Sequence, residues 1–138
     1  MSTDDDRPAA PESDGHGSDS LAISNAMVAI YKEQFGRGPT KTRTHWASRD
    51  VITVTLEDTL TPAERNLVKG GEHQRLRDLR LYFQYANVRD FCGPIEEVTG
   101  RKVRAFISGI DTELDVASEM FVLHPVGYGG PSRASLPG

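Results

Sequence analysis

The sequence predicts an α+β fold of two layers, in which helices cover one face of a four-stranded antiparallel sheet. Two observations lead to this prediction. Apolar residues recur at helical spacing in residues 21–35 and again in residues 61–98. Each of these regions is followed by two short extended segments that are separated by turn residues. The resulting order, αββαββ, buries one stripe of each helix and one face of the sheet most simply as a helix layer on a sheet.

Composition divides the 138 residues into three parts. Residues 1–18 are rich in Asp, Ser, Pro and Gly, which predicts a disordered acidic leader. Residues 19–124 fit a single domain, and the glycines and prolines of residues 125–138 predict a flexible tail. Residues 1–19 hold six acidic side chains against one arginine, so the remainder of the chain is nearly neutral. Because general nucleic-acid binders are usually basic, no nucleic-acid partner is expected.

The sequence contains no run of about 18 apolar residues, so it predicts no direct membrane span. The acidic N-terminus does not match a signal peptide, which begins with positive charge and an apolar run. The lone Cys92 excludes an intrachain disulfide and fits a reducing compartment. We therefore expect a soluble, cytoplasmic protein, whose role at a membrane would depend on a partner protein or on lipid headgroups.

The first helix should run from about Leu21 to Phe35, with Ser18 or Ser20 as its N-cap. Its apolar residues form one stripe at helical spacing, namely Ile23, Met27, Ile30, Tyr31 and Phe35. Two extended segments follow, Thr42–Trp46 and Val51–Glu57, and the turn residues 47–50 between them predict a hairpin.

The segment Thr61-Pro62-Ala63-Glu64 predicts the start of a second, long helix, because Thr61 and Glu64 can form a capping box and Pro62 suits the first helical position. Its expected apolar stripe extends to about residue 98 and comprises Leu76, Leu79, Phe83, Ala86, Phe91, Ile95 and Val98. Since this stripe is longer than a four-stranded sheet needs, a homodimer that shares the helix or a sheet edge is one way to cover it.

Glycine and proline predict the weak points of this long helix. Gly70-Gly71 is a weak point near its start, and Gly93-Pro94 should kink or break it near its end, because proline lacks the backbone N–H. Thr99-Gly100 should terminate it. Two further extended segments, Lys102–Ser108 and Leu114–Leu123, predict the second hairpin.

The connector between the first helix and the first hairpin, residues 36–43, is the candidate binding site. It reads Gly-Arg-Gly-Pro-Thr-Lys-Thr-Arg, so three cations and two hydroxyls surround a turn shaped by glycine and proline. Backbone N–H groups beside such cations suit a phosphate, a carboxylate or a partner's acidic surface. The candidate residues are Arg37, Gly38, Thr40, Lys41 and Arg43. The connector is not a phosphate-binding Walker loop, which follows a strand; a helix C-cap with a solvated basic turn is the alternative interpretation.

Other groups offer no recognisable catalytic or metal-binding arrangement. Cys92 lies beside the apolar stripe without a neighbouring base, so we expect it to be structural. The four histidines (His16, His45, His73 and His124) lack the spacing of a metal site, and we predict no metal or cofactor. Asp111, Glu113 and Asp115 alternate as calcium ligands do but lack the rest of that motif, so a solvated loop is expected.

The arginines in the middle of the long helix are Arg75, Arg77, Arg80 and Arg89. Acidic residues are interspersed among them, which is typical of a solvent-exposed helix face. The alternative hypothesis is a binding surface, in which this helix face lies beside Arg37 and Lys41 and forms one positive surface with them.

Five segments resemble the MpsC domain, a family named for a Na⁺-translocating, membrane-potential-generating system of bacteria. They occur in the family's order over residues 20–124: 23–26, 36–41, 60–64, 99–103 and 121–123. The resemblance implies a small cytoplasmic accessory protein of membrane machinery for cation transport or inorganic-carbon uptake, with no catalytic residues. Gly93-Pro94 departs from the uninterrupted helix that the family leads us to expect there.

We therefore hypothesise a non-enzymatic accessory or regulatory domain that docks, at the inner face of the membrane, to a subunit of a transport or bioenergetic complex. The connector would be its contact surface. The alternative is a soluble sensor that binds a phosphorylated or carboxylated metabolite at the same connector. A third reading is an enzyme that uses His45 or Cys92. A concave pocket around Arg37 would favour the sensor, whereas a flat surface would favour docking.

Overall fold

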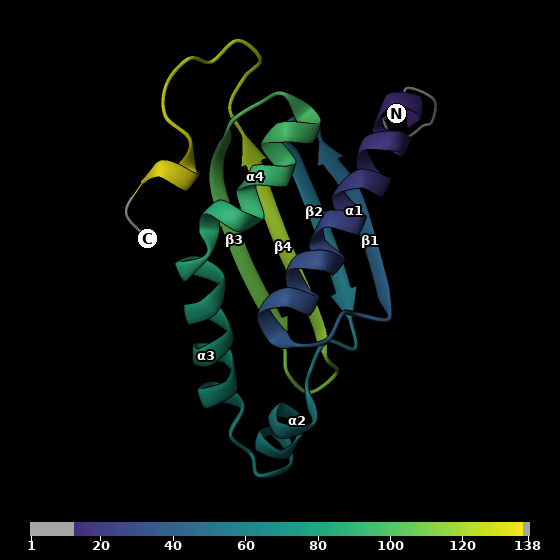
Figure 1. The fold of residues 1–138 in the computed structure, drawn as a ribbon, viewed down its shortest axis with the longest axis vertical. Helices are drawn as coiled ribbons and strands as arrows, with labels where there is room; N and C mark the ends of the chain where they lie inside the picture. The colour runs from purple at the N-terminus through teal and green to yellow at the C-terminus, as the bar shows by residue number, and fades with distance from the viewer. Residues whose placement is uncertain (1–12, 137–138) are drawn as a thin grey trace.

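The computed structural model describes residues 13–136, which form four α-helices, four strands and one short 3₁₀ helix (Figure 1). In chain order these are α1 (Ser13–Phe35), β1 (Lys41–Ser48), β2 (Val51–Glu57), α2 (Pro62–Lys69), α3 (His73–Ala86), α4 (Val88–Thr99), β3 (Val103–Asp111), β4 (Val116–Leu123) and η1 (Arg133–Ser135). The order is the predicted αββαββ, except that the second helical region is divided into three.

The strands form one antiparallel sheet in the order β1-β2-β4-β3. Each hairpin supplies two neighbouring strands, and the pairing of β2 with β4 joins the hairpins at the centre of the sheet. In that pairing Ile52 lies opposite Phe121, and Leu56 lies opposite Ala117. Every second residue of β2 is buried, as the alternation of its apolar side chains predicts.

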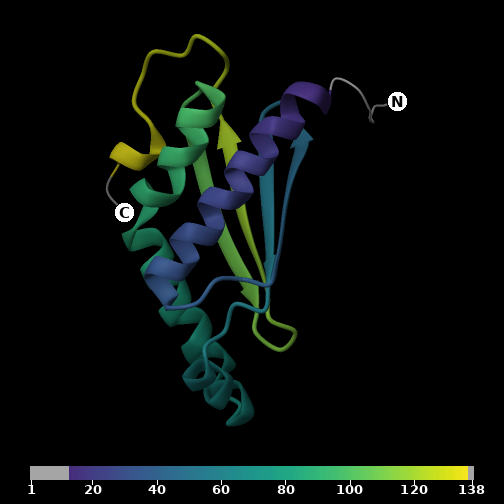
Figure 2. The ribbon, with the colours of Figure 1, turned by 45° about the vertical axis from the view of Figure 1, so that its right-hand side comes forward.

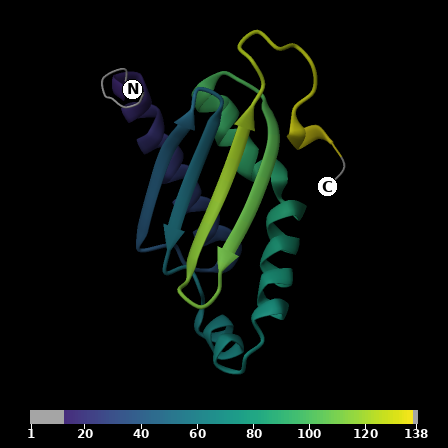
Figure 3. The same cartoon turned by 180° about the vertical axis from the view of Figure 1, so that it is seen from behind.

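The helices cover one face of the sheet. Helices α1 and α4 cross this face in Figures 1 and 2, and α3 and α2 continue the layer past the end of the sheet. Figure 3 shows the opposite face, over which no described helix lies. The predicted α+β class with a four-stranded antiparallel sheet and helices on one face is therefore confirmed.

The core lies between the sheet and helices α1 and α4. Phe91 of α4, Phe106 of β3 and Phe121 of β4 stack in sequence, with ring centroids 5.4 and 5.2 Å apart. Tyr31 of α1 meets Phe91 edge to face at 6.3 Å. Such aromatic pairs stabilise a core beyond the apolar area they bury, so these contacts fix both helices against the sheet.

Helix α1 begins earlier than predicted. It starts at Ser13 rather than near Leu21, so it includes residues 13–18 of the predicted leader. Acidic residues favour the N-terminal end of a helix because they oppose its dipole, so the composition that suggested disorder also suits a first helical turn. Residues 1–12 of the predicted leader lie outside the described residues.

The C-terminal segment makes specific contacts that the sequence did not predict. Ser132 caps η1 and donates a hydrogen bond of 2.6 Å to Glu96 of α4. Lys102 donates from Nζ to the carbonyl oxygen of Gly130 at 2.8 Å. These bonds join the segment to α4 and to the residue before β3; the flexibility of residues 125–138 stays a prediction, and residues 137–138 lie outside the described range.

The long helix is interrupted at two points. The first is the predicted weak point, where Gly71 adopts a φ of 77° after α2 has ended. The second is Asn87, whose side-chain amide donates to the carbonyl oxygen of Phe83 at 2.7 Å. The prediction of a break at Gly93-Pro94 is wrong, because α4 continues through Pro94 to Thr99. The residue four places before Pro94 is the exposed Asp90, where water can replace the missing bond.

Candidate functional site

The predicted connector is divided between two sides of the molecule. The Arg37 guanidinium donates to both carboxylate oxygens of Asp58, at 3.2 and 3.1 Å, and to the carbonyl oxygen of Leu60 at 2.9 Å. These bonds from Arg37 are the main reason that the pKa of Asp58 lies below its usual value. Arg37 therefore holds the connector onto the segment that follows β2, and its charge is offset within the chain.

Lys41 and Arg43 lie on the other side, on the uncovered face of the sheet. The residue that follows Arg43, Thr44, hydrogen-bonds through its hydroxyl to Ser24 of α1 at 2.7 Å, so Thr44 faces the helix layer. Successive side chains of a strand point to opposite faces, which places Lys41 and Arg43 on the uncovered face. Both are exposed, and neither forms an ion pair within residues 13–136.

Gly38 and Thr40 shape the connector between these two sides. A Cβ added at Gly38 would lie 2.8 Å from Cγ of Lys32, so a glycine lets the connector run close to α1. The exposed Thr40 donates its backbone N–H to the carbonyl oxygen of Glu57 at 3.0 Å, which starts the β1–β2 ladder. The five predicted residues are thus neighbours in sequence but do not converge on one point.

Arg37 belongs to a network of charged and polar groups at this end of the sheet, which we call the ionic network: Arg37, Asp58, Thr59, Glu64, Arg65, Arg80 and Asp115. Arg65 pairs with Asp58 and lies 3.5 Å from Asp115. Asp115 accepts hydrogen bonds from the backbone N–H groups of Thr59, at 2.9 Å, and Leu60, at 3.1 Å. The network ties the connector to α2 and to the β3–β4 turn.

Arg80 is the buried centre of this network. Only 1% of its side chain is exposed, and it donates two hydrogen bonds of 2.7 Å to the carboxylate of Glu64. It also donates to the carbonyl oxygen of Thr59 at 2.9 Å, and its guanidinium lies 3.9 Å from the centre of the Phe35 ring. Burial raises the pKa of Glu64, but the hydrogen bonds from Arg80 and Thr61, together with the Arg80 charge, outweigh this effect and hold that pKa below its usual value.

The burial of Arg80 corrects the predicted face of the long helix. In α3 the buried residues are Leu76, Arg80 and Gln84, whereas Leu79 and Phe83 are 43% and 40% exposed. Relative to the prediction, α3 is rotated about its axis, because Arg80 and Gln84 form hydrogen bonds with Glu64 and Glu119 in the interior. Polar contacts rather than apolar surface therefore decide which side of α3 faces inward. The interpretation of Arg80 as part of a solvent-exposed face is therefore wrong. The long apolar stripe on which the homodimer prediction rested is not continuous, since some of its residues are buried and others are exposed.

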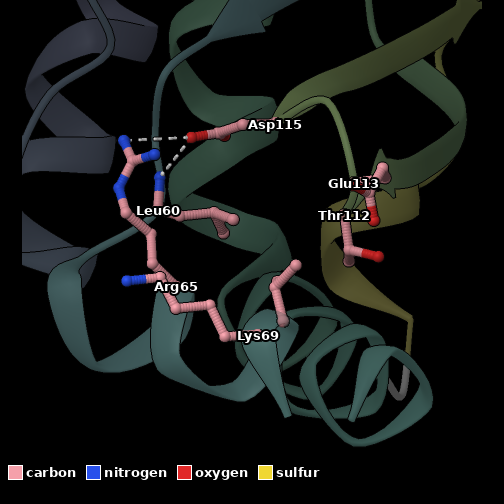
Figure 4. A pocket seen from close by; sticks show the side chains of 7 residues that line it. Leu60, Arg65, Lys69, Thr112, Glu113 and Asp115 are labelled. Carbon is pink, nitrogen blue, oxygen red and sulfur yellow. Dashed lines mark hydrogen bonds and ion pairs between the residues drawn. The ribbon is translucent and has the colours of Figure 1, made fainter. Parts of the chain in front are cut away.

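A shallow pocket of about 180 Å³ lies between α2 and the β3–β4 turn (Figure 4). It is lined by Leu60, Arg65, Val68, Lys69, Thr112, Glu113 and Asp115. Figure 4 shows Arg65 and Asp115 joined on one side, with Thr112 and Glu113 on the other. None of the five predicted residues lines this pocket. The buried Asp115 also corrects the expectation of a fully solvated acidic loop.

Three of the four histidines considered as metal ligands lie among the described side chains, and each has a different environment. His73 shares a short contact of 2.5 Å with the Thr112 hydroxyl and lies 3.5 Å from Glu113. His45 is exposed on β1, and His124 stacks on Tyr128 with ring centroids 3.6 Å apart. Across residues 13–136, no three His, Cys, Asp or Glu side chains are grouped so that they could hold a metal ion.

Cys92 is buried in α4, and burial raises the pKa of its thiol to about 12. Because the thiolate is the reactive form, we expect a thiol reagent at pH 7.5 to label native protein about a hundredfold more slowly than urea-unfolded protein. Absorbance of the released chromophore measures both rates. Equal rates in the two states would contradict the structural role of this cysteine.

No helix among the described residues is long and apolar enough to cross a membrane. A comparison with protein families gives one match, a family model described as "Na+-translocating membrane potential-generating system (MpsC)", over residues 17–125. Searches of curated proteins and of solved structures found no match. The match includes the connector, the ionic network and all four strands.

Proposed function

Because this chain belongs to the MpsC family, we propose that it is a non-enzymatic accessory or regulatory domain of a Na⁺-translocating, membrane-potential-generating system. The proposal places it at the cytoplasmic face of the membrane, bound to a subunit of the transport complex. Family membership supports the association with such a system. The observation that supports docking is the pair of exposed cations, Lys41 and Arg43, on a sheet face that no described helix covers.

The contact surface that we propose consists of Thr40, Lys41 and Arg43. β1 is an edge strand, so its outer backbone groups are open to a partner as well as its side chains. An acidic surface on the partner would complement the two cations and would speed its approach. Arg37 is not part of this surface, because its guanidinium is engaged by Asp58.

The alternative function, a sensor of an anionic metabolite, is less well supported by the arrangement of the connector. A small anion is usually held in a concavity by several convergent donors. Here Arg37 points to Asp58, while Lys41 and Arg43 lie along an uncovered strand. A broad, flat contact with a macromolecule fits this geometry better.

Reversing the two exposed charges should abolish docking. We expect Lys41→Glu/Arg43→Glu to recover at least about tenfold less of the transport-complex subunits from native membranes than the tagged wild-type chain, since repulsion replaces attraction at both positions. Quantitative mass spectrometry of the recovered proteins measures the change. The matched control is Arg75→Glu/Arg89→Glu, which changes the net charge equally at exposed helix positions.

Recovery that is unchanged by the β1 reversal, or reduced equally by the control, would refute the proposed surface. Circular dichroism of each variant checks that the fold is retained. A thermal-shift screen with phosphorylated and carboxylated metabolites tests the alternative, because a ligand well above its Kd raises the stability of the folded state. A stabilising metabolite whose effect the β1 reversal abolishes would favour the sensor.

A further inference from the structure

A carboxyl group is buried in the middle of the sheet, on the face that the helices cover. Glu119 of β4 is fully buried, and its neighbours in the sheet register are Val54 of β2 and Ser108 of β3. The ionic network is built from a different set of residues, and Glu119 forms no ion pair within the described chain. A carboxylate in such a position is costly unless it is well hydrogen-bonded or takes up a proton.

The hydrogen bonds of Glu119 are distributed unevenly between its two oxygens. Oε2 accepts from the Tyr31 hydroxyl of α1 at 2.5 Å and from Nε2 of Gln84 of α3 at 2.8 Å. Nε2 of Gln84 also donates to the Tyr31 oxygen at 3.1 Å, which closes a triangle of three side chains. Oε1 has no hydrogen-bond partner among the described residues.

This asymmetry indicates which oxygen would carry a proton. In a neutral carboxylic acid one oxygen accepts hydrogen bonds and the other carries the hydrogen and donates it. Oε2 already accepts two bonds, so the proton belongs on Oε1. The Ser108 hydroxyl, which lies opposite Glu119 in the sheet register, has no hydrogen-bond partner in the described chain. A hydroxyl can donate to the carboxylate or accept from the neutral acid, so Ser108 can serve both protonation states.

The groups that face Glu119 come from every element packed around it. The titratable or charged ones within the described range are Tyr31 of α1 and Arg80 of α3, and Gln84 and Ser108 are neutral. Burial raises the pKa of Glu119 to about 7, against the opposing effects of the polar contacts with Tyr31, Ser108 and Gln84 and of the Arg80 charge. Burial and the nearby Glu119 raise the pKa of Tyr31 well above its usual value, so Tyr31 keeps its proton throughout.

We propose that Glu119, Tyr31, Gln84 and Ser108 form a proton-sensitive switch, in which the buried Glu119 side chain takes up and releases a proton. The neutral acid would bind α1 and α3 to the sheet more tightly than the carboxylate does. Both helices lead to the ionic network. In α3, Arg80 lies one turn before Gln84, and in α1 the ring of Phe35, on which Arg80 stacks, lies one turn after Tyr31. The proton would thus regulate the end of the molecule that carries the connector, which goes beyond the docking role proposed above.

The direction of the pH effect follows from the two protonation states. The unfolded chain releases the proton near pH 4.5, whereas the folded chain keeps it until about pH 7. Between these values the folded state binds more protons, so its stability falls as the pH rises and levels off above neutrality. Through this one group, the equilibrium constant for unfolding should be on the order of a hundredfold larger at pH 8 than at pH 5.

The first test measures the wild-type protein directly. Selectively ¹³C-labelled glutamate allows the Glu119 carboxyl shift to be followed by NMR, and we expect its midpoint above pH 6. A midpoint near 4.5, the value of an ordinary glutamate, would overturn the proposal. Because no substitution is involved, this result does not depend on whether a variant folds.

The second test compares Glu119→Gln with Glu97→Gln, the same change at an exposed position of α4. The amide at position 119 mimics the neutral acid, so we expect the hundredfold pH dependence of the unfolding constant to disappear. The surface variant should keep it. Hydrogen exchange at pH 6 and pH 8, corrected for the intrinsic exchange rates, should show more frequent opening of α1 and α3 at the higher pH in the wild-type protein and in Glu97→Gln, but not in Glu119→Gln. An unchanged pH dependence in Glu119→Gln would overturn the switch, whatever the docking experiment shows.

Discussion

Replacing Arg80 with methionine should lower the free energy of unfolding by about 3–5 kcal/mol, one of the two largest effects that we expect of a single substitution here. Methionine retains the apolar contact with Phe35 but removes the donors to Glu64 and Thr59. Glu64 then remains as a half-buried carboxylate without its cation, which is the main source of the cost. Urea denaturation followed by circular dichroism measures the loss.

Two further variants test the reason for this loss. Arg75→Met makes the same chemical change at a side chain that is 74% exposed, and should cost less than about 0.5 kcal/mol. Glu64→Gln in the Arg80→Met background removes the stranded charge, so the double variant should be more stable than Arg80→Met alone. If Arg80→Met cost no more than Arg75→Met, the buried pair would not contribute to stability.

Replacing Asp115 with alanine should lower the free energy of unfolding by about 2–3 kcal/mol. The change leaves the backbone N–H groups of Thr59 and Leu60 and the Thr59 hydroxyl without an acceptor. Asp115 also adopts a φ of 58°, which alanine disfavours. Thermal and urea unfolding both measure the loss.

Asn and Gly at position 115 separate these two causes. Glycine tolerates the positive φ but still lacks the acceptor, so its cost should be somewhat smaller than that of alanine. Asparagine keeps one acceptor oxygen and also tolerates this backbone conformation, so it should be the mildest of the three. If asparagine destabilised the protein as much as alanine, the charge facing Arg65 would matter more than the hydrogen bonds.

The local elements could be predicted from the sequence because their signals lie within a few residues. The Thr61–Glu64 capping box forms as expected, with both of its hydrogen bonds present. Gly100 ends α4 with a φ of 71°, and the two hairpins lie close to their predicted ranges. Alternation along β2 identified its buried face correctly.

The candidate site could be predicted only in part, because its contacts join residues far apart in the sequence. The connector was recognised as cationic, but the partner of Arg37 is Asp58, and no local pattern indicates that pairing. The binding role of the connector stays a prediction. One signal was available for Glu119: it alternates with Ala117 and Phe121 on β4, which places it on the buried face.

Arg80 had a similar signal. It lies four residues after Leu76 and four before Gln84, so the three share one side of α3. Hydrophobicity favoured the neighbouring side, with Leu79 and Phe83, because an apolar stripe normally faces inward. The buried acceptors that reverse this preference belong to other elements, and their position could not be inferred before the fold was known.

The pairing of β2 with β4 has a consequence for how this chain folds. Each hairpin closes over a short turn, but Glu57 and Val116 meet only after all of residues 58–115 have been looped back. Closing such a loop costs conformational entropy before any stabilising contact between β2 and β4 has formed. We therefore expect the two hairpins to form early and independently, and the pairing of β2 with β4 to be the slow step of folding. Until that pairing forms, β2 and β4 each present an unpaired edge that can aggregate.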